Sequence, residues 1–200
     1  MTDLQLDDSW IRLNSYSERE FNQMKRFSFL LGVLLAASPL TLVEAQASTV
    51  ILARHAEKSS PTGDAGLTAV GEQRARDLAA TLANVRLAAV ISTQYQRTRL
   101  TAAPVAQAAG LEVTIIPANP DPAAIVRALD ALPAGSTALV IGHSNTLAPI
   151  IAALGGPRLP DLCDGEHSTL FVLERPGGEK PVSLVRAKYG AAEPPETSRC

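Results

Sequence analysis

The chain has 200 residues, of which 46% are hydrophobic and 19% are charged, and its formal net charge is −2. This apolar content is too high for a disordered chain. The near-neutral balance argues against a general nucleic-acid binder, which normally carries a basic excess. Two cysteines are too few for a disulfide scaffold or for a zinc module built from cysteines. The length suits one domain with an appendage.

The segment 24–47 has the parts of an export signal in the required order. A Lys-Arg pair opens it, the run 27–37 is apolar and free of charge, and the sequence AQA at 45–47 is a cleavage site of the A-x-A type. The apolar run is shorter than the roughly 20 residues that span a bilayer. We therefore predict a cleaved signal peptide rather than a buried helix or a signal anchor. The prediction implies a periplasmic or secreted protein with no membrane span after cleavage.

Residues 1–23 form an acidic leader, which is unusual ahead of an export signal. We interpret this leader as a misassigned translation start, with Met24 as the true start. A cytoplasmic tail on an uncleaved anchor is the alternative. The mature chain is then expected to begin at Ser48, with one domain at 48–189 and a flexible tail at 190–200.

Short apolar runs alternate with helical segments along the mature chain. The strands are expected at 49–53, 88–92, 112–116, 137–141, 168–173 and 182–186, and the helices at 68–82, 97–109, 122–132 and 146–154. Such alternation predicts an α/β fold, a three-layer α/β/α sandwich around a mainly parallel sheet. The last two strands can form a hairpin that adds an antiparallel edge to this sheet.

Polar side chains follow three of the expected strands. Arg54 and His55 come directly after the first strand, Arg97 follows the second and His143 follows the fourth. Ligands of parallel α/β sheets bind at the carboxyl ends of the strands, so these four side chains are expected to converge. Each of them alone has an ordinary structural explanation, whereas their conjunction at three strand ends indicates a site.

These residue types suit phosphoryl transfer. The planar arginine fork matches two phosphate oxygens, and a neutral histidine is a competent nucleophile toward phosphorus. Nearby guanidinium charges disfavour the imidazolium form and so keep the nucleophile neutral. The cationic side chains neutralise the phosphate, so the scheme needs no metal ion and no cofactor.

The same residues resemble the histidine phosphatase superfamily, whose fold is similar to that of phosphoglycerate mutase. Four stretches resemble motifs of this family, in the expected order. Arg54-His55-Ala56 resembles the Arg-His-Gly/Ala motif, and residues 66–71 resemble the LT…G entry to a helix. Residues 93–102 resemble the S-P-L-x-R…T-A segment, and residues 142–145 resemble the motif of the second histidine. The resemblance covers about residues 49–173. It implies a phosphoglycerate mutase-like fold, in a small exported bacterial member of the superfamily.

The resemblance also implies roles for individual residues. His55 would be the nucleophile that becomes phosphorylated, while Arg54, Arg97 and His143 would bind the phosphoryl oxygens. Thr93 and Gln94 stand where the family has Ser-Pro, although the offset of the arginine is kept. No general acid transfers, because Ser144-Asn145 follows the second histidine where one branch of the family has an acidic residue, and the other branch uses a Glu in an insertion.

Glu57 and Asp121 are the candidates for the missing acid. Glu57 lies two residues after the nucleophile and is counted with the catalytic residues, but an ion pair with Lys58 or with a neighbouring arginine explains it equally well. For Asp121 we favour a structural role at the start of a helix.

Three further residues stand outside this scheme. His167 lies in an acidic loop before a strand, and we interpret it as a surface residue rather than as a metal or substrate ligand. Cys163 and Cys200 can pair in an oxidising exported setting, or both can stay as thiols.

The residues and the resemblance together predict an exported, metal-independent phosphatase that acts on small-molecule phosphate esters through a phosphohistidine. The lack of a clear acid keeps a non-catalytic phosphate-binding module open as an alternative. A phosphoglycerate mutase-type phosphotransferase is a second alternative, although the mature chain leaves little room for the lid that such enzymes need. A nucleic-acid partner is not expected, and the oligomeric state stays open.

Overall fold

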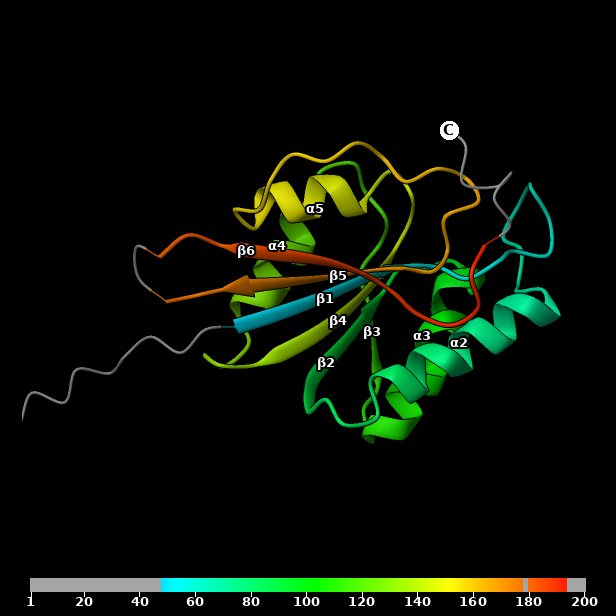
Figure 1. Cartoon of the computed structure of the whole chain (residues 1–200), viewed down its shortest axis with the longest axis horizontal. Coiled ribbons are helices and arrows are strands. Elements are labelled where there is room, and N and C mark those ends of the chain that lie inside the picture. Colours follow the sequence, from blue (N-terminus) through cyan, green and yellow to red (C-terminus); the bar gives the residue numbers. More distant parts are fainter. Residues whose placement is uncertain (1–47, 178–179, 194–200) are drawn as a thin grey trace, which may run out of the picture. The chain divides into compact units, whose positions relative to one another are not determined.

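The computed structural model describes residues 48–177 and 180–193 (Figure 1). The predicted leader and signal peptide lie outside the described residues. Within these residues the elements are, in chain order, β1 (Ser48–Arg54), α2 (Ala69–Thr81), β2 (Leu87–Ser92), α3 (Gln96–Ala109), β3 (Val113–Ile115), α4 (Ala123–Asp130), β4 (Thr137–Gly142), α5 (Leu147–Ala153), β5 (Thr169–Arg175) and β6 (Ser183–Lys188). Every predicted strand and helix is present, with its ends shifted by a few residues at most.

The strands form one sheet in the order β3-β2-β4-β1-β5-β6. The strands β1, β2, β3 and β4 are parallel, β5 is antiparallel to β1, and β6 is antiparallel to β5. The predicted mainly parallel sheet with an antiparallel hairpin is therefore confirmed. Because β1 lies between β4 and β5, the residues after β1 adjoin both the end of β4 and the segment before β5.

Helices cover both faces of the sheet, with α4 and α5 on one face and α2 and α3 on the other (Figure 1). Strand β1 shows why two cores form. Val50 and Leu52 pack on the side of α4 and α5, while Ile51 and Ala53 pack on the side of α2 and α3. Successive side chains of a strand point to opposite faces, so a continuous apolar run is buried on both. The predicted three-layer sandwich is confirmed.

Helix α2 begins and packs as the sequence indicates. The Thr68 hydroxyl accepts a hydrogen bond from the Gly71 amide at 3.0 Å, which caps the helix. A Cβ atom at Gly71 would lie 2.4 Å from the Glu57 carbonyl oxygen. Only glycine allows this approach. It brings the start of α2 against the loop that follows β1.

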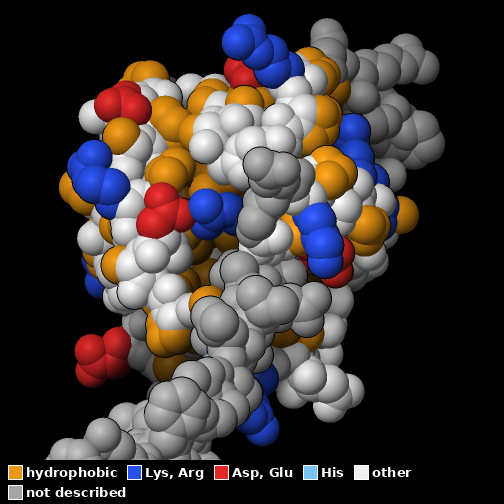
Figure 2. All heavy atoms as spheres, turned by 90° about the vertical axis from the view of Figure 1, so that its left-hand side faces the viewer, with side chains coloured by type: hydrophobic (Ala, Val, Ile, Leu, Met, Phe, Trp, Pro, Cys, Tyr) orange, Lys and Arg blue, Asp and Glu red, His pale blue; other side chains and the backbone are white. Residues whose placement is uncertain are grey.

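Figure 2 views the described domain from the side at which the parallel strands begin. Acidic and basic side chains are interspersed there with apolar ones. The described side chains visible in this view show no concentration of one charge (Figure 2). The carboxyl ends of the parallel strands, where the polar cluster is predicted, lie at the opposite end of the sheet. Among the described helices, none is long and apolar enough to cross a membrane.

Candidate active site

A cavity of about 330 Å³ lies at the carboxyl ends of β1 and β4 and beside the start of α3. Its lining includes the four residues predicted for the site, which are Arg54, His55, Arg97 and His143. The other lining residues come from five loops: Lys58, Tyr95, Ala118, Asn119, Pro120, Ser144, Asn145, Thr146 and Asp164. The predicted convergence is present, since side chains more than 40 positions apart in sequence share one cavity.

The end of β4 holds His55 in place. Arg54 pairs in register with Gly142, and the His55 amide donates a hydrogen bond to the Gly142 carbonyl at 3.0 Å. His143 comes next in the chain, so its ring lies beside that of His55, with 5.4 Å between the ring centroids. Both rings are buried.

The position of the proton on the His55 ring is identified by its neighbour. Its Nδ1 lies 2.8 Å from the Ala56 carbonyl oxygen, which can only accept a hydrogen bond. Nδ1 therefore carries the proton, and Nε2 carries the lone pair. Burial, followed by the charges of Arg54 and Arg97, lowers the pKa of His55 to about 3, although the Ala56 hydrogen bond opposes the shift. The imidazole is therefore neutral at pH 7, with its lone pair on Nε2.

The Arg54 guanidinium is held by the backbone of a distant loop. Its Nη1 donates to the carbonyl oxygens of Cys163 at 2.6 Å and Asp164 at 2.8 Å. Its Nε is buried and has no hydrogen-bond partner among the described residues. Leaving a buried N–H donor without an acceptor costs folding free energy. The Arg54 guanidinium therefore has one donor, Nε, that its contacts with the loop do not use.

Arg97 lies in the first turn of α3 and is placed by stacking. Its guanidinium carbon lies 4.3 Å from the centroid of the Tyr95 ring. Tyr95 in turn meets the His143 ring edge to face, with the centroids 5.3 Å apart. A cation stacked on an aromatic ring keeps its edge free for hydrogen bonds to an anion.

A chain of hydroxyl groups orients His143. Thr93 Oγ1 lies 3.1 Å from His143 Nε2 and 2.7 Å from Thr98 Oγ1. The Thr98 hydroxyl donates to the Tyr95 carbonyl at 2.8 Å, which leaves its oxygen to accept from Thr93. Thr93 then accepts from His143 Nε2. Threonine thus supplies the hydroxyl at the position where the family has serine. Burial and the charges of Arg97 and Arg54 lower the pKa of His143 to about 4.

The carboxylate of Glu57 is turned away from the cavity and is paired with Arg74. Arg74 Nε lies 2.9 and 3.0 Å from the two carboxylate oxygens, and Nη2 lies 2.7 Å from Oε1. Burial alone would raise the pKa of Glu57, but the hydrogen bonds and charge of Arg74 lower it. A carboxylate that stays ionised has no proton to donate. Of the two interpretations left open by the sequence, the geometry favours the ion pair.

Asp121 also lies outside the cavity lining. Its Oδ1 accepts a hydrogen bond from the Ala123 amide at 3.0 Å, at the start of α4, and the residue is exposed. The favoured interpretation of a carboxylate at a helix start agrees with this contact. Its neighbours Asn119 and Pro120 line the cavity instead.

The prediction that His167 is a surface residue is wrong. The residue is buried, and its Nδ1 lies 2.9 Å from the His55 carbonyl oxygen. The cause is the antiparallel pairing of β5 with β1, in which Ala53 is opposite Leu170. This register places the residues before β5 beside those after β1. Had the β5–β6 hairpin been placed beside β1 in the prediction, His167 would have been expected near His55.

Residues 190–193 belong to the segment expected to be a flexible tail, but they are bound to the domain. Arg74 Nη1 donates to the Ala191 carbonyl at 2.9 Å. The Glu193 carboxylate accepts from the amides of His167 and Ser168 and from the Ser168 hydroxyl. Burial alone would raise the pKa of Glu193, but these Ser168 hydrogen bonds lower it to about 2. Cys200 lies outside the described residues, so its pairing with Cys163 stays a prediction.

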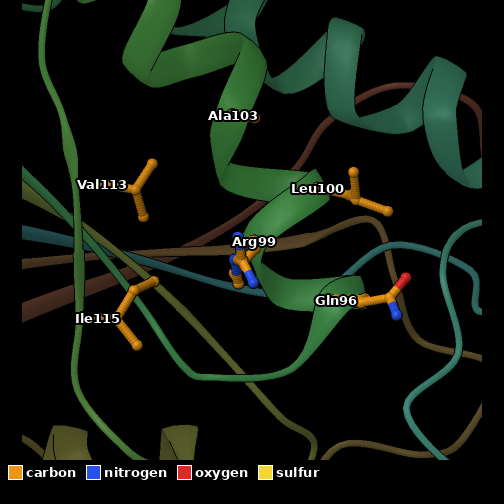
Figure 3. A pocket seen from close by; sticks show the side chains of 6 residues that line it. All are labelled: Gln96, Arg99, Leu100, Ala103, Val113 and Ile115. Carbon is orange, nitrogen blue, oxygen red and sulfur yellow. The ribbon is translucent and has the colours of Figure 1, made fainter.

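A larger hollow, of about 540 Å³, lies elsewhere on the domain. It is formed by α3 and the edge strand β3, and Leu100, Val113 and Ile115 are among its lining residues (Figure 3). Its lining contains neither a histidine nor a carboxylate. Size alone therefore does not locate the chemistry, which belongs to the smaller cavity with the converging polar groups.

No metal-ligating cluster was expected from the sequence. In the part of the chain that the structure describes, no group of three or more His, Cys, Asp or Glu side chains is arranged to hold a metal ion.

The comparisons with known proteins agree with this geometry. Residues 50–118 match the family model of the histidine phosphatase superfamily (branch 1). The match includes β1 with Arg54 and His55 and the α3 entry with Arg97. No curated protein matches the sequence.

Solved structures show the fold. The native structure of mycobacterial glucosyl-3-phosphoglycerate phosphatase is 14% identical, with a TM-score of 0.56, and the match covers 74% of this chain and 100% of that one. A protein from Agrobacterium tumefaciens assigned as the phosphohistidine phosphatase SixA is 21% identical, with a TM-score of 0.52, and the match covers 72% and 97%. One from Escherichia coli assigned as an alpha-ribazole-5'-P phosphatase is 19% identical, with a TM-score of 0.56 and the same coverage.

Proposed function

We propose that this chain is a phosphatase of the histidine phosphatase superfamily, which hydrolyses phosphate monoesters through a phosphohistidine on His55 and without a metal ion. The observation that carries the proposal is the neutral His55 ring. Its Nδ1 is bound to a backbone carbonyl, and the residue lines a cavity that Arg54, Arg97 and His143 also line. Nucleophile and anion-binding groups are thus assembled before substrate arrives.

The first half of the reaction uses the lone pair of Nε2. It attacks the phosphorus atom, a nitrogen–phosphorus bond forms and the bond to the ester oxygen breaks. The two guanidinium groups bind the equatorial oxygens, where charge is concentrated in the transition state. The negative charge of bound phosphate raises the proton affinity of His143, which then donates to a phosphoryl oxygen as well. In the second half, water attacks phosphorus and releases His55.

The neighbours in structure act on different phosphate compounds, as their names state, and they share only the fold with this chain. We therefore assign the class of small-molecule phosphate esters and no single substrate. The cavity is open and mostly polar, which suits a polar alcohol as the leaving group.

The expected result in solution is a p-nitrophenyl phosphatase activity that EDTA does not reduce, because cationic side chains carry out the charge neutralisation. Quenching in alkaline denaturant with phosphate-labelled substrate should trap a phosphoenzyme that is stable in base and loses its label in acid. A chain that binds phosphate but neither turns over nor traps label would instead be a phosphate-binding module. Loss of activity in EDTA, restored by a divalent metal, would contradict metal independence.

We also propose that the enzyme is exported. The order of basic pair, apolar run and A-x-A sequence in 24–47 supports this proposal. The secreted or periplasmic protein should start at or near Ser48 on N-terminal sequencing. It should show no tryptophan emission, because Trp10 would be removed. Full-length protein retained at the membrane would contradict cleavage.

A further inference from the structure

The reaction needs a group that protonates the leaving oxygen, and neither candidate from the sequence reaches the cavity. Glu57 is held by Arg74, and Asp121 is exposed outside the lining. The lining nevertheless contains one carboxylate among the described residues, that of Asp164. We propose that Asp164 is the proton-transfer residue of the site, which rests on the proposed phosphatase function.

Tertiary structure brings Asp164 to the site through a loop that the domain holds firmly. Arg54 Nη1 binds the backbone carbonyls of both Cys163 and Asp164. The Cys163 amide donates to Glu166 Oε2 at 3.0 Å. The Leu162 amide donates to the Ser144 carbonyl at 3.1 Å, next to His143. The backbone of the loop is thus tied to both sides of the phosphate site.

The carboxylate of Asp164 is not used for this attachment. It is fully exposed, with a relative side-chain accessibility of 102%, and its Oδ1 lies 3.5 Å from Arg54 Nη2. A contact of this length is weak compared with the two bonds to the backbone carbonyls. The side chain can therefore turn toward the mouth of the cavity, where the ester oxygen of a bound substrate must face solvent. Glu57 differs in this respect, because Arg74 holds both of its carboxylate oxygens.

The proposed steps balance. As Nε2 of His55 bonds to phosphorus and the phosphorus–oxygen bond breaks, the protonated carboxyl of Asp164 gives its proton to the leaving oxygen, and an alcohol departs. The carboxylate then takes a proton from the attacking water while the water oxygen bonds to phosphorus. The nitrogen–phosphorus bond breaks, its electron pair returns to Nε2, phosphate leaves, and Asp164 is protonated again.

The leaving group separates this role from a purely electrostatic one. Asp164→Asn keeps the shape and the backbone contacts but carries no transferable proton. At mildly acidic pH, kcat/KM for an alkyl phosphate should fall about 100-fold or more, within the usual range for a general acid. For p-nitrophenyl phosphate kcat/KM should change less than about 3-fold, because nitrophenolate leaves without help. Its kcat should fall, with a burst of nitrophenol and accumulated phosphoenzyme, since water is no longer activated.

Asp161→Asn is the matched control, because Asp161 is an exposed aspartate in the same loop that does not line the cavity. The values of kcat/KM for both substrates should be the same in this variant as in the wild type. Equal losses of kcat/KM on both substrates in Asp164→Asn, no loss on either, or the same losses in the control would overturn the assignment while the wild type remains an active phosphatase. A wild-type protein that releases no phosphate from any ester overturns the proposed function as well.

Discussion

Replacing His55 with alanine is expected to abolish phosphate release, with a fall in kcat of about 10³-fold or more. A chain without its covalent nucleophile keeps only the binding and electrostatic contributions of the site. Trapped phosphoenzyme should disappear at the same time. The readout is phosphate release from p-nitrophenyl phosphate together with labelling of the enzyme after an alkaline quench.

Binding should survive this substitution, because Arg54 and Arg97 remain. Inorganic phosphate should raise the melting temperature of both proteins, which also shows that the variant folds. His167→Gln is the matched control, since His167 is buried against the backbone of His55 but offers no nucleophile. We expect kcat of this variant to fall about tenfold at most, and we expect the phosphoenzyme still to be trapped. Equally slow turnover in the wild type and in His55→Ala would refute the proposal that this chain is an enzyme.

The Glu57–Arg74 pair should be a large contributor to stability. Arg74 is 3% exposed and Glu57 is 23% exposed, and the fork of Arg74 meets both carboxylate oxygens. Arg74→Met leaves the carboxylate half-buried without its partner and frees two backbone carbonyls of the segment 189–191. We expect the free energy of unfolding to fall by about 2–4 kcal/mol, measured by urea denaturation.

In the double variant Glu57→Gln/Arg74→Met, the free energy of unfolding should fall by less than the sum of the falls in the two single variants, because the two side chains interact. Asp130→Asn is the control, since it breaks an exposed 2.8 Å pair with Arg175 and should cost at most about 1 kcal/mol. The same Glu57→Gln protein also tests the acid that the sequence suggested. If it loses activity on alkyl phosphates alone while its stability is unchanged, Glu57 rather than Asp164 transfers the proton.

Local pattern was sufficient for the elements. The run Thr49–Ala53 is short, apolar and β-branched, and it forms β1 within one residue at either end. Thr68 caps α2, and Gly110 ends α3 in a left-handed conformation with φ of 67°. Such signals act through hydrogen bonds and dihedral angles of neighbouring residues, so they can be read without knowing the fold.

The convergence of Arg54, His55, Arg97 and His143 was also predictable from sequence, because parallel strands present their carboxyl ends at the same edge of a sheet. The contacts that each side chain makes were harder to predict from sequence. Glu57 is close to His55 in sequence, but its carboxylate binds Arg74, which is 17 positions away on α2. Which partner a charged side chain selects depends on packing between elements.

Sequence by itself thus determined the α/β class, the strand and helix positions, and the four residues that meet in the polar cavity, because these depend on periodicity, caps and strand polarity. Only the tertiary structure decided what surrounds that site. Strand β5 runs antiparallel beside β1, so the segment 163–168 returns to the edge where β1 ends. That return buries His167 against His55 and brings Asp164 to the cavity, more than 100 positions from the nucleophile. Neighbours joined by strand pairing at such a distance leave no local signal in the chain.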